Sequence, residues 1–189
     1  MNSNPVKLII LDRDGVINHD SDQYIKTPEE WVPIPGSLEA IALLNQSGYH
    51  VVVASNQSGV GRGLFDMSAL IAMHTKLHRA LAHIGGRIDA IFFCPHAADD
   101  GCSCRKPKPG LFHQIAERFA TDLQGVPAVG DSTRDLEAAA SVGCLPLLVR
   151  TGKGMKTLAE NRMPEGTMVF DDLAAAAAYL LARDEAAGQ

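Results

Sequence analysis

Lys-Leu-Ile-Ile-Leu-Asp-Arg-Asp-Gly, at residues 7–15, is a short apolar run that ends in two acidic residues and a glycine. A run this short and this rich in branched aliphatic residues is typical of a buried strand. Gly15 allows the backbone to turn sharply after it. In an extended backbone Asp12 and Asp14 point the same way, so they could act as a nucleophile with an acid/base partner, or bind a metal. Taken alone, the pair could equally be two solvated acids at a strand end.

Similar apolar runs recur along the chain, and helical patterns separate them. Polar residues begin the helical stretches and glycines end them. This alternation predicts an α/β fold with a doubly wound parallel sheet and helices on both faces. The predicted strands are Lys7–Leu11, His50–Ala54, Ala90–Cys94, Val126–Gly130, Leu145–Val149 and Met168–Phe170. The predicted helices are Ser37 to Gly48, Asp66 or Ser68 to Gly85, Leu111 to Leu123, Arg134 to Val142, and a C-terminal helix around residues 174–182.

The composition is that of an ordinary globular protein, with 46% hydrophobic and 21% charged residues among 189. We expect residues 1–189 to form a single domain. The formal net charge of −5 argues against nucleic acid as a partner, since binding it usually needs a basic face. No apolar run is long enough to span a bilayer, and Met1–Leu11 lacks the features of a signal peptide. We therefore expect a cytoplasmic monomer with neither a nucleic-acid nor a membrane partner.

Polar side chains follow several of the predicted strands, where ligands of open parallel sheets bind. Ser55 and Asn56 offer a hydroxyl and an amide to a phosphate oxygen. Asp131 ends another strand, and Asp135 follows four residues later. The Arg-Lys pair at 105–106 supplies positive charge. Each of these residues could be a helix cap or a surface charge, but their joint placement at one edge of the sheet favours a phosphate site.

The segment Leu11–Asn18 resembles the first motif of the haloacid-dehalogenase superfamily. Ser55, Lys106 and the segment Gly130–Asp135 match the second, third and fourth motifs in chain order. The resemblance extends from Lys7 to about Gly152. It implies a magnesium-dependent phosphatase without a large cap domain, which works through an aspartyl-phosphate.

The resemblance also implies a role for each matching residue. Asp12 would attack phosphorus, while Asp14 would protonate the leaving alkoxide and then deprotonate the attacking water. Magnesium would be bound by the carboxylates of Asp12 and Asp131 and by the backbone carbonyl of Asp14. The phosphoryl group would be held by Ser55 and Lys106, and the metal ligands would be supported by Asp135.

Three of the four cysteines fall in one loop, at Cys94, Cys102 and Cys104, and His96 lies between them. These four side chains have the types and the number that tetrahedral zinc requires. We predict a zinc-binding loop at residues 94–104. Its role would be structural, because a filled tetrahedral site has no open position. The alternative is a loop with incidental thiols.

The zinc loop, Asp-Arg-Asp-Gly and Ser-Asn-Gln-Ser-Gly (residues 55–59) together resemble the D-glycero-D-manno-heptose 1,7-bisphosphate 7-phosphatases. That likeness implies a small-molecule sugar bisphosphate as substrate and a place in making the heptose precursor of lipopolysaccharide. The histidinol-phosphate phosphatases, whose substrate has a single phosphate, share most motifs and remain an alternative. An alternative of another class is a non-catalytic, zinc-stabilised binding module.

Substrate specificity has to come from loops, because the segment between Gly15 and Ser37 is too short for a large cap. Arg62 and Arg105 could pair with a second phosphate. The candidate substrate and phosphate-binding residues are Arg13, Asp20, Ser55, Asn56, Gln57, Ser58, Arg62, Arg105 and Lys106.

Overall fold

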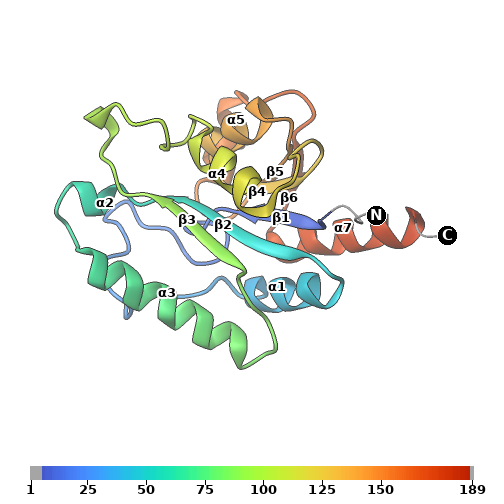
Figure 1. Ribbon diagram of the computed structural model, residues 1–189, viewed down its shortest axis with the longest axis horizontal. Helices are drawn as coiled ribbons and strands as arrows, with labels where there is room; N and C mark the ends of the chain where they lie inside the picture. The colour runs from blue at the N-terminus through green and yellow to red at the C-terminus, as the bar shows by residue number, and fades with distance from the viewer. Residues whose placement is uncertain (1–5, 188–189) are drawn as a thin grey trace.

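The structure is a computed structural model that describes residues 6–187. Its centre is a six-stranded sheet in the order β3-β2-β1-β4-β5-β6, and every neighbouring pair of strands is parallel (Figure 1). The six predicted strands are confirmed, with small shifts at their ends. The strands are β1 (Leu8–Leu11), β2 (His50–Asn56), β3 (Ala90–Cys94), β4 (Pro127–Gly130), β5 (Leu145–Val149) and β6 (Met168–Phe170).

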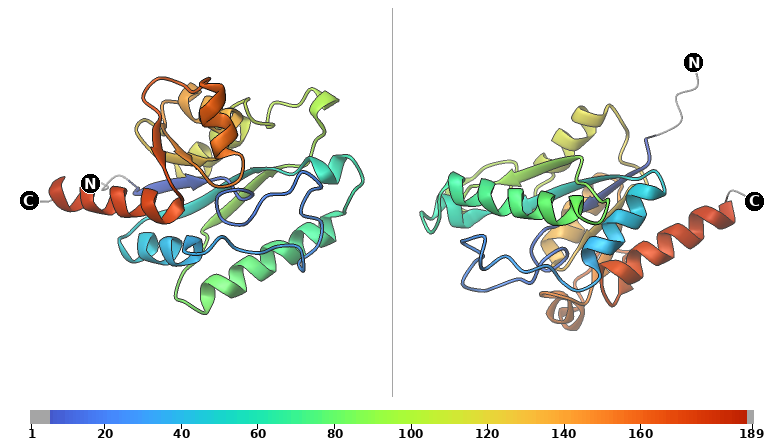
Figure 2. Two further views of the ribbon diagram at one scale, coloured as in Figure 1. Left: turned by 180° about the vertical axis from the view of Figure 1, so that it is seen from behind. Right: turned by 90° about the horizontal axis from the view of Figure 1, so that it is seen from below.

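Helices cover both faces of the sheet, as the strand-helix alternation predicts (Figure 2). One face is covered by α1 (Ser37–Gln46), α3 (Met67–Ala82) and α7 (Leu173–Ala187). The other face is covered by α4 (Gly110–Phe119) and α5 (Thr133–Ser141). The chain is therefore a three-layer α/β sandwich, and both surfaces of the sheet are buried.

The alternation of side chains along β1 shows why both layers are needed. Ile9 and Leu11 pack into the core under α1, α3 and α7, whereas Leu8 and Ile10 pack into the core under α4 and α5. All four side chains are at most 2% exposed. Each contributes about 1.5–3 kcal/mol on burial, so the continuous apolar run is explained by two covered faces.

Two details of the helices differ from the sequence expectation. The helix predicted to reach Leu123 ends at Phe119, because Ala120 adopts a left-handed conformation with φ of 47°. Three short elements were not predicted: α2 (Ser58–Gly61), a 3-10 turn at Ala98–Asp100, and α6 (Gly154–Glu160). None is long enough to show a helical period in the sequence.

The order of the strands places a switch point between β1 and β4. The chain runs outward from β1 through β2 to β3, then returns to β4 and continues through β5 to β6. Ligands of such sheets bind at this point, beyond the carboxyl ends of the strands. Asp12 follows β1 there and Asp131 follows β4. No helix within residues 6–187 combines the length and the apolar composition needed to cross a membrane.

Candidate active site

A cavity of about 410 Å³ opens beyond the carboxyl ends of β1, β2 and β4. Most of the predicted site residues lie in its wall, although they come from segments far apart in the sequence. The sheet brings these segments together because its parallel strands all end at the same edge. The predicted residues that line the cavity are Asp12, Asp14, Asp20, Ser55, Asn56, Gln57, Ser58, Arg62, Arg105, Lys106, Asp131 and Asp135.

Three carboxylates converge at the base of the cavity. Asp12, Asp131 and Asp135 each have an oxygen within 4.8 Å of the others. Asp131 packs tightly between Gly15 and Gly152, since a side chain at either glycine would overlap its carboxylate. The backbone N–H of Lys153 also donates to Asp131 Oδ2 at 2.8 Å. The glycines therefore position a carboxylate that the sequence predicts as a metal ligand.

Lys106 supplies positive charge to this cluster from a buried position. Its Nζ lies 3.1 Å from Asp12 Oδ1 and 2.6 Å from Asp135 Oδ1. It also donates to the carbonyl of Ala54 at 2.6 Å. The remaining oxygen of Asp135 accepts from the backbone N–H and the hydroxyl of Ser132, at 3.0 and 2.6 Å. Asp135 is thus engaged by Lys106 and Ser132, which fits a supporting role behind the ligands.

The crowded carboxylates have shifted pKa values. Burial raises the pKa of Asp12 to about 7, although Lys106 opposes the rise. Burial, with the negative charges of Asp135 and Asp12, raises the pKa of Asp131 to about 8. Burial also acts on Asp135, but Lys106 outweighs it and lowers the pKa of that carboxyl. The single positive charge of Lys106 does not neutralise three carboxylates. Carboxylate oxygens are also the ligands that Mg²⁺ prefers, so this donor set fits a divalent cation.

Arg13 lies behind Asp14. Its side chain is 1% exposed, and its Nε and Nη2 donate to the two carboxylate oxygens of Asp14 at 3.0 and 3.1 Å. The same Nη2 donates to Gln57 Oε1 at 3.1 Å. The sequence expectation was a contact with phosphate, but Nε and Nη2 donate to protein groups, and Nη1 is buried without a hydrogen-bond partner among residues 6–187.

Asn56 is engaged in a similar way, with the backbone of Lys106. Its amide nitrogen donates to the Lys106 carbonyl at 3.1 Å, and its amide oxygen accepts from the Lys106 N–H at 3.0 Å. These reciprocal bonds join the end of β2 to the loop that carries Lys106. The loop is thereby held with Lys106 beside Asp12.

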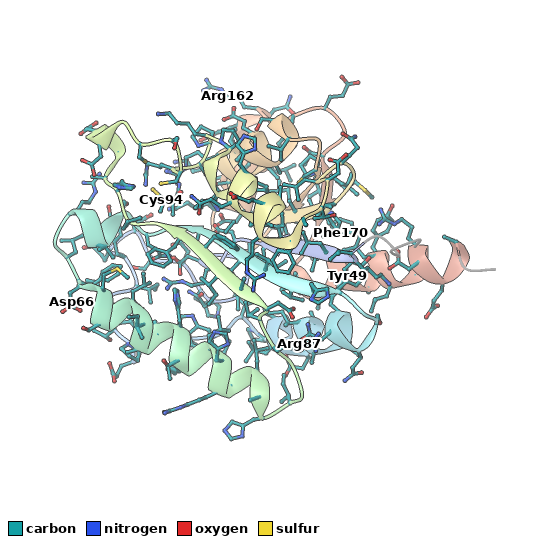
Figure 3. All side chains as sticks on the ribbon, viewed as in Figure 1. Tyr49, Asp66, Arg87, Cys94, Arg162 and Phe170 are labelled. Atoms are coloured by element: carbon teal, nitrogen blue, oxygen red, sulfur yellow. The ribbon has the colours of Figure 1, made fainter. Side chains whose placement is uncertain are left out.

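The predicted zinc ligands also come together. Cys94 Sγ lies 3.5 Å from His96 Nδ1 and 3.6 Å from Cys102 Sγ, and Cys104 Sγ lies 3.3 Å from the same nitrogen. Tetrahedral zinc bonds of about 2.0–2.3 Å would place neighbouring ligand atoms about 3.5–3.8 Å apart. Cys94 ends β3, where the chain enters this loop (Figure 3). The cluster is therefore compatible with a tetrahedral metal site.

The rim of the cavity contains residues that were not predicted from the sequence. Lys153 lies 3.1 Å from Asp20 Oδ2 and 3.8 Å from Asp22 Oδ1. It follows β5 by four residues, so the strand-end rule that points to Asp131 would also have found it. Tyr24, Ile25 and Ala98 were not predicted either. The rest of the lining comes from segments that the sequence singles out, namely Ser21 and Asp22 in the loop after the first motif, and Ser132 and Arg134 in the fourth motif.

Comparison with known proteins gives consistent matches. Residues 103–176 match the HAD-hydrolase-like family. The chain is 62% identical to the D-glycero-beta-D-manno-heptose-1,7-bisphosphate 7-phosphatase of Bordetella bronchiseptica, over 93% of this chain and 98% of that one. It is 59% identical to the enzyme of the same name from Pseudomonas aeruginosa, over 92% and 97%.

One solved structure is also closely similar. It is the crystal structure of the D,D-heptose 1,7-bisphosphate phosphatase from B. bronchiseptica complexed with magnesium and phosphate. The TM-score is 0.93 at 62% sequence identity, with 94% of this chain and 99% of that chain covered.

Proposed function

The chain belongs to the family of D-glycero-beta-D-manno-heptose-1,7-bisphosphate 7-phosphatases, and we infer that it hydrolyses the 7-phosphate of that sugar bisphosphate. The observation that carries this function is the arrangement of Asp12, Asp131 and Lys106 in one cavity, together with similarity along nearly the whole chain to an enzyme crystallised with magnesium and phosphate. The histidinol-phosphate alternative is not favoured, because the matches at 50–62% identity all carry the heptose name.

Asp12 and Asp14 would divide the chemistry between them. Asp12 attacks the phosphorus, an aspartyl-phosphate forms and the bond from phosphorus to O7 breaks, while Asp14 gives O7 its proton. Water then attacks the phosphorus as Asp14 takes up a proton, which releases phosphate and restores the Asp12 carboxylate. Magnesium, when bound by Asp12 and Asp131, supplies the charge that offsets repulsion between carboxylate and phosphate.

Lys106 and Ser55 would hold the transferred phosphoryl group. Lys106 already lies 3.1 Å from Asp12, so its charge is in place beside the attacking oxygen. The Ser55 side chain is 1% exposed and lines the same cavity. Both donors would face oxygens whose negative charge grows in the transition state, and preorganised donors of this kind are worth about 3–4 kcal/mol each.

The distal phosphate would be recognised by cations at the rim of the cavity, namely Arg62, Arg105, Arg134 and Lys153. Arg105 also lies near the metal-binding loop, with its Nη1 3.5 Å from the His96 carbonyl. We propose that zinc fills the site formed by Cys94, His96, Cys102 and Cys104 and holds this loop. The four thiol and imidazole ligands support zinc over magnesium.

The same proposal covers the wider setting of the enzyme. We propose that the whole chain forms one domain, and that it acts in the cytoplasm on the heptose precursor of lipopolysaccharide. Thiols arranged as metal ligands rather than as disulfides support a reducing compartment.

Phosphate release tests the function directly. With Mg²⁺ present, kcat/KM should be compared for the beta anomer of heptose 1,7-bisphosphate, its alpha anomer, fructose 1,6-bisphosphate and histidinol phosphate. We expect the beta heptose to be the best substrate by about tenfold or more. A preference for histidinol phosphate would contradict the substrate, and no release from any of them would contradict the mechanism.

A further inference from the structure

The side-chain amide of Gln57 joins two groups that act on the substrate. Its Nε2 donates to Ser55 Oγ at 2.8 Å and to Asp14 Oδ2 at 2.9 Å. Its Oε1 accepts from Arg13 Nη2 at 3.1 Å. Gln57 is 4% exposed and Arg13 is 1% exposed. One buried amide thus links the phosphate-binding hydroxyl, the acid/base carboxylate and a buried guanidinium.

The chemistry of its neighbours fixes the orientation of this amide. A guanidinium has donors only, and an ionised carboxylate has acceptors only. If the Gln57 amide were flipped, its NH₂ would face the donors of Arg13 and its oxygen would face the acceptors of Asp14. Both contacts would then be repulsive. Arg13 and Asp14 therefore dictate from opposite sides which way the amide points.

The orientation of Gln57 decides what Ser55 can offer to a phosphate. A hydroxyl has one hydrogen to donate and two lone pairs that accept. Because Gln57 donates to Ser55 Oγ, one acceptor position is occupied and the hydroxyl hydrogen is free to point into the cavity. An acceptor at the position of Nε2 would draw that hydrogen away. The amide thus presents Ser55 as a donor.

The same amide completes the surroundings of Asp14. Asp14 Oδ1 accepts from Arg13 Nε at 3.0 Å and from Asn18 Nδ2 at 2.8 Å. Asp14 Oδ2 accepts from Arg13 Nη2 at 3.1 Å and from Gln57 Nε2 at 2.9 Å. These four hydrogen bonds engage both oxygens of Asp14 and fix the plane of its carboxyl group. Proton transfer depends on such placement of the acid/base group.

We propose that Arg13 and Gln57 are positioning residues of the phosphatase, rather than ligands of the phosphate. Arg13 sets the polarity of the Gln57 amide, and Gln57 in turn presents the Ser55 hydroxyl as a donor and holds Asp14 at the cavity wall. The proposal rests on the proposed function, because it explains how Ser55 and Asp14, two residues of the proposed mechanism, are positioned.

Gln57→Glu tests the orientation of donor and acceptor at residue 57 with little change in the shape of the side chain. Glutamate keeps the acceptor that faces Arg13, but it replaces the donor that faces Ser55 and Asp14 with a second acceptor. Ser55 would then donate to residue 57, and Asp14 would be repelled. Two substrates separate the effects: the heptose bisphosphate, whose leaving alkoxide needs a proton, and 4-nitrophenyl phosphate, whose leaving phenolate does not.

We expect Gln57→Glu to lower kcat/KM on the heptose bisphosphate by about 10⁴-fold or more, through both Ser55 and Asp14, because kcat/KM reports the step in which the leaving group departs. On 4-nitrophenyl phosphate the loss of kcat/KM should be about 100-fold, because in that step only the contribution of Ser55 is removed. Inhibition by inorganic phosphate should weaken as well. Gln114→Glu, the same change at an exposed position of α4, should leave both substrates unaffected.

An equal loss on both substrates would overturn the proposal, since a purely structural defect lowers the active fraction for each alike. Unchanged kinetics would overturn it too. If Gln57→Glu does not fold, Arg13→Lys gives the same comparison, because one ammonium cannot serve both Asp14 and Gln57 as the guanidinium fork does. Failure of the unaltered enzyme to hydrolyse the heptose bisphosphate would instead contradict the proposed function.

Discussion

The Nζ atom of Lys106 lies 3.1 Å from the Oδ1 atom of Asp12, and the two side chains are 2% and 13% exposed. Asp12, the proposed nucleophile, therefore has a cation beside it before any phosphate enters the cavity. Burial alone would favour the neutral form of an aspartic acid, which cannot attack phosphorus. The contact with Lys106 favours the ionised form. Substitution of Asp12 would measure how much this carboxylate contributes to activity.

Asp12→Asn should lower kcat by about 10⁴-fold or more, since the amide has a similar shape but is a very poor nucleophile. The measurement is phosphate release from heptose bisphosphate at saturating Mg²⁺. Circular dichroism and Tm would establish that the variant is folded. Substantial residual turnover would contradict the assignment of Asp12 as the nucleophile.

The increase in Tm that Mg²⁺ causes should depend on pH. The pKa of Asp12 is raised to about 7 and that of Asp131 to about 8, so the metal-free folded state binds more protons than the unfolded state below these values. The stabilisation from these two groups is complete below about pH 4 and is lost as the pH rises through about 7–8. Mg²⁺ replaces the protons, so it should raise Tm more at about pH 8.5 than at about pH 6.

Thermal unfolding with and without Mg²⁺ at the two pH values measures this difference. Ca²⁺ at equal concentration controls for ionic strength and for the preference of the site. A Tm increase of the same size at both pH values would contradict the shifted pKa values of Asp12 and Asp131.

Metal analysis should find about one zinc ion per chain in protein prepared without chelator. Cys104→Ser should lower that content and lower Tm, because the cluster loses a thiolate ligand. Cys144→Ala is the matched control, since Cys144 is buried outside the cluster and its loss should leave the zinc content unchanged. Zinc-free protein with an unaltered Tm would contradict the structural role.

Lys153→Met should raise KM for the bisphosphate by about tenfold, with a smaller effect on a monophosphate substrate. The side chain loses its charge, while the backbone N–H that donates to Asp131 remains. Lys156→Met is the control, because Lys156 is a 77% exposed side chain paired with Glu160 in α6. Equal effects of the two substitutions would argue against recognition of the distal phosphate by Lys153.

Gly152→Ala should raise the concentration of Mg²⁺ needed for half-maximal activity by about tenfold or more, because the new Cβ would overlap Asp131. Gly152 also has a positive φ, which strains alanine by about 1 kcal/mol. Gly166→Ala separates the two effects, since Gly166 has φ of 81° with open space around it. If both variants need the same higher concentration of Mg²⁺, the overlap with Asp131 is not the cause.

The sequence predicts the sheet and the chemical groups at its edge because both depend on local patterns. Asp12 and Asp131 each follow a short apolar run, so a parallel sheet alone places both at its carboxyl edge. Their direct meeting also depends on the strand order, which puts β1 beside β4. Lys153 follows β5 and lines the cavity, but it was not among the predicted site residues, which follow the other strands.

The hydrogen-bond partners of a site residue are harder to predict from the sequence than whether the residue belongs to the site. Arg13 and Asn56 were expected to bind phosphate, yet the structure shows that their donors reach Asp14, Gln57 and the Lys106 backbone. These contacts depend on side-chain directions after a turn, which neither period nor composition encodes. The end of α4 at Phe119 was also not predicted. The left-handed residue that ends this helix is Ala120, and only a glycine there would have marked the end in the sequence.

With zinc bound as we propose, the loop at residues 94–104 would make the enzyme dependent on the zinc supply of the cell, although zinc would take no part in the reaction. Lys106 stands two residues after Cys104, and Cys104 Sγ lies 3.3 Å from His96 Nδ1 in the cluster. A newly made chain that finds no zinc would carry Lys106 on an unanchored loop. A cell starved of this nutrient would then lose phosphatase activity while still making the protein.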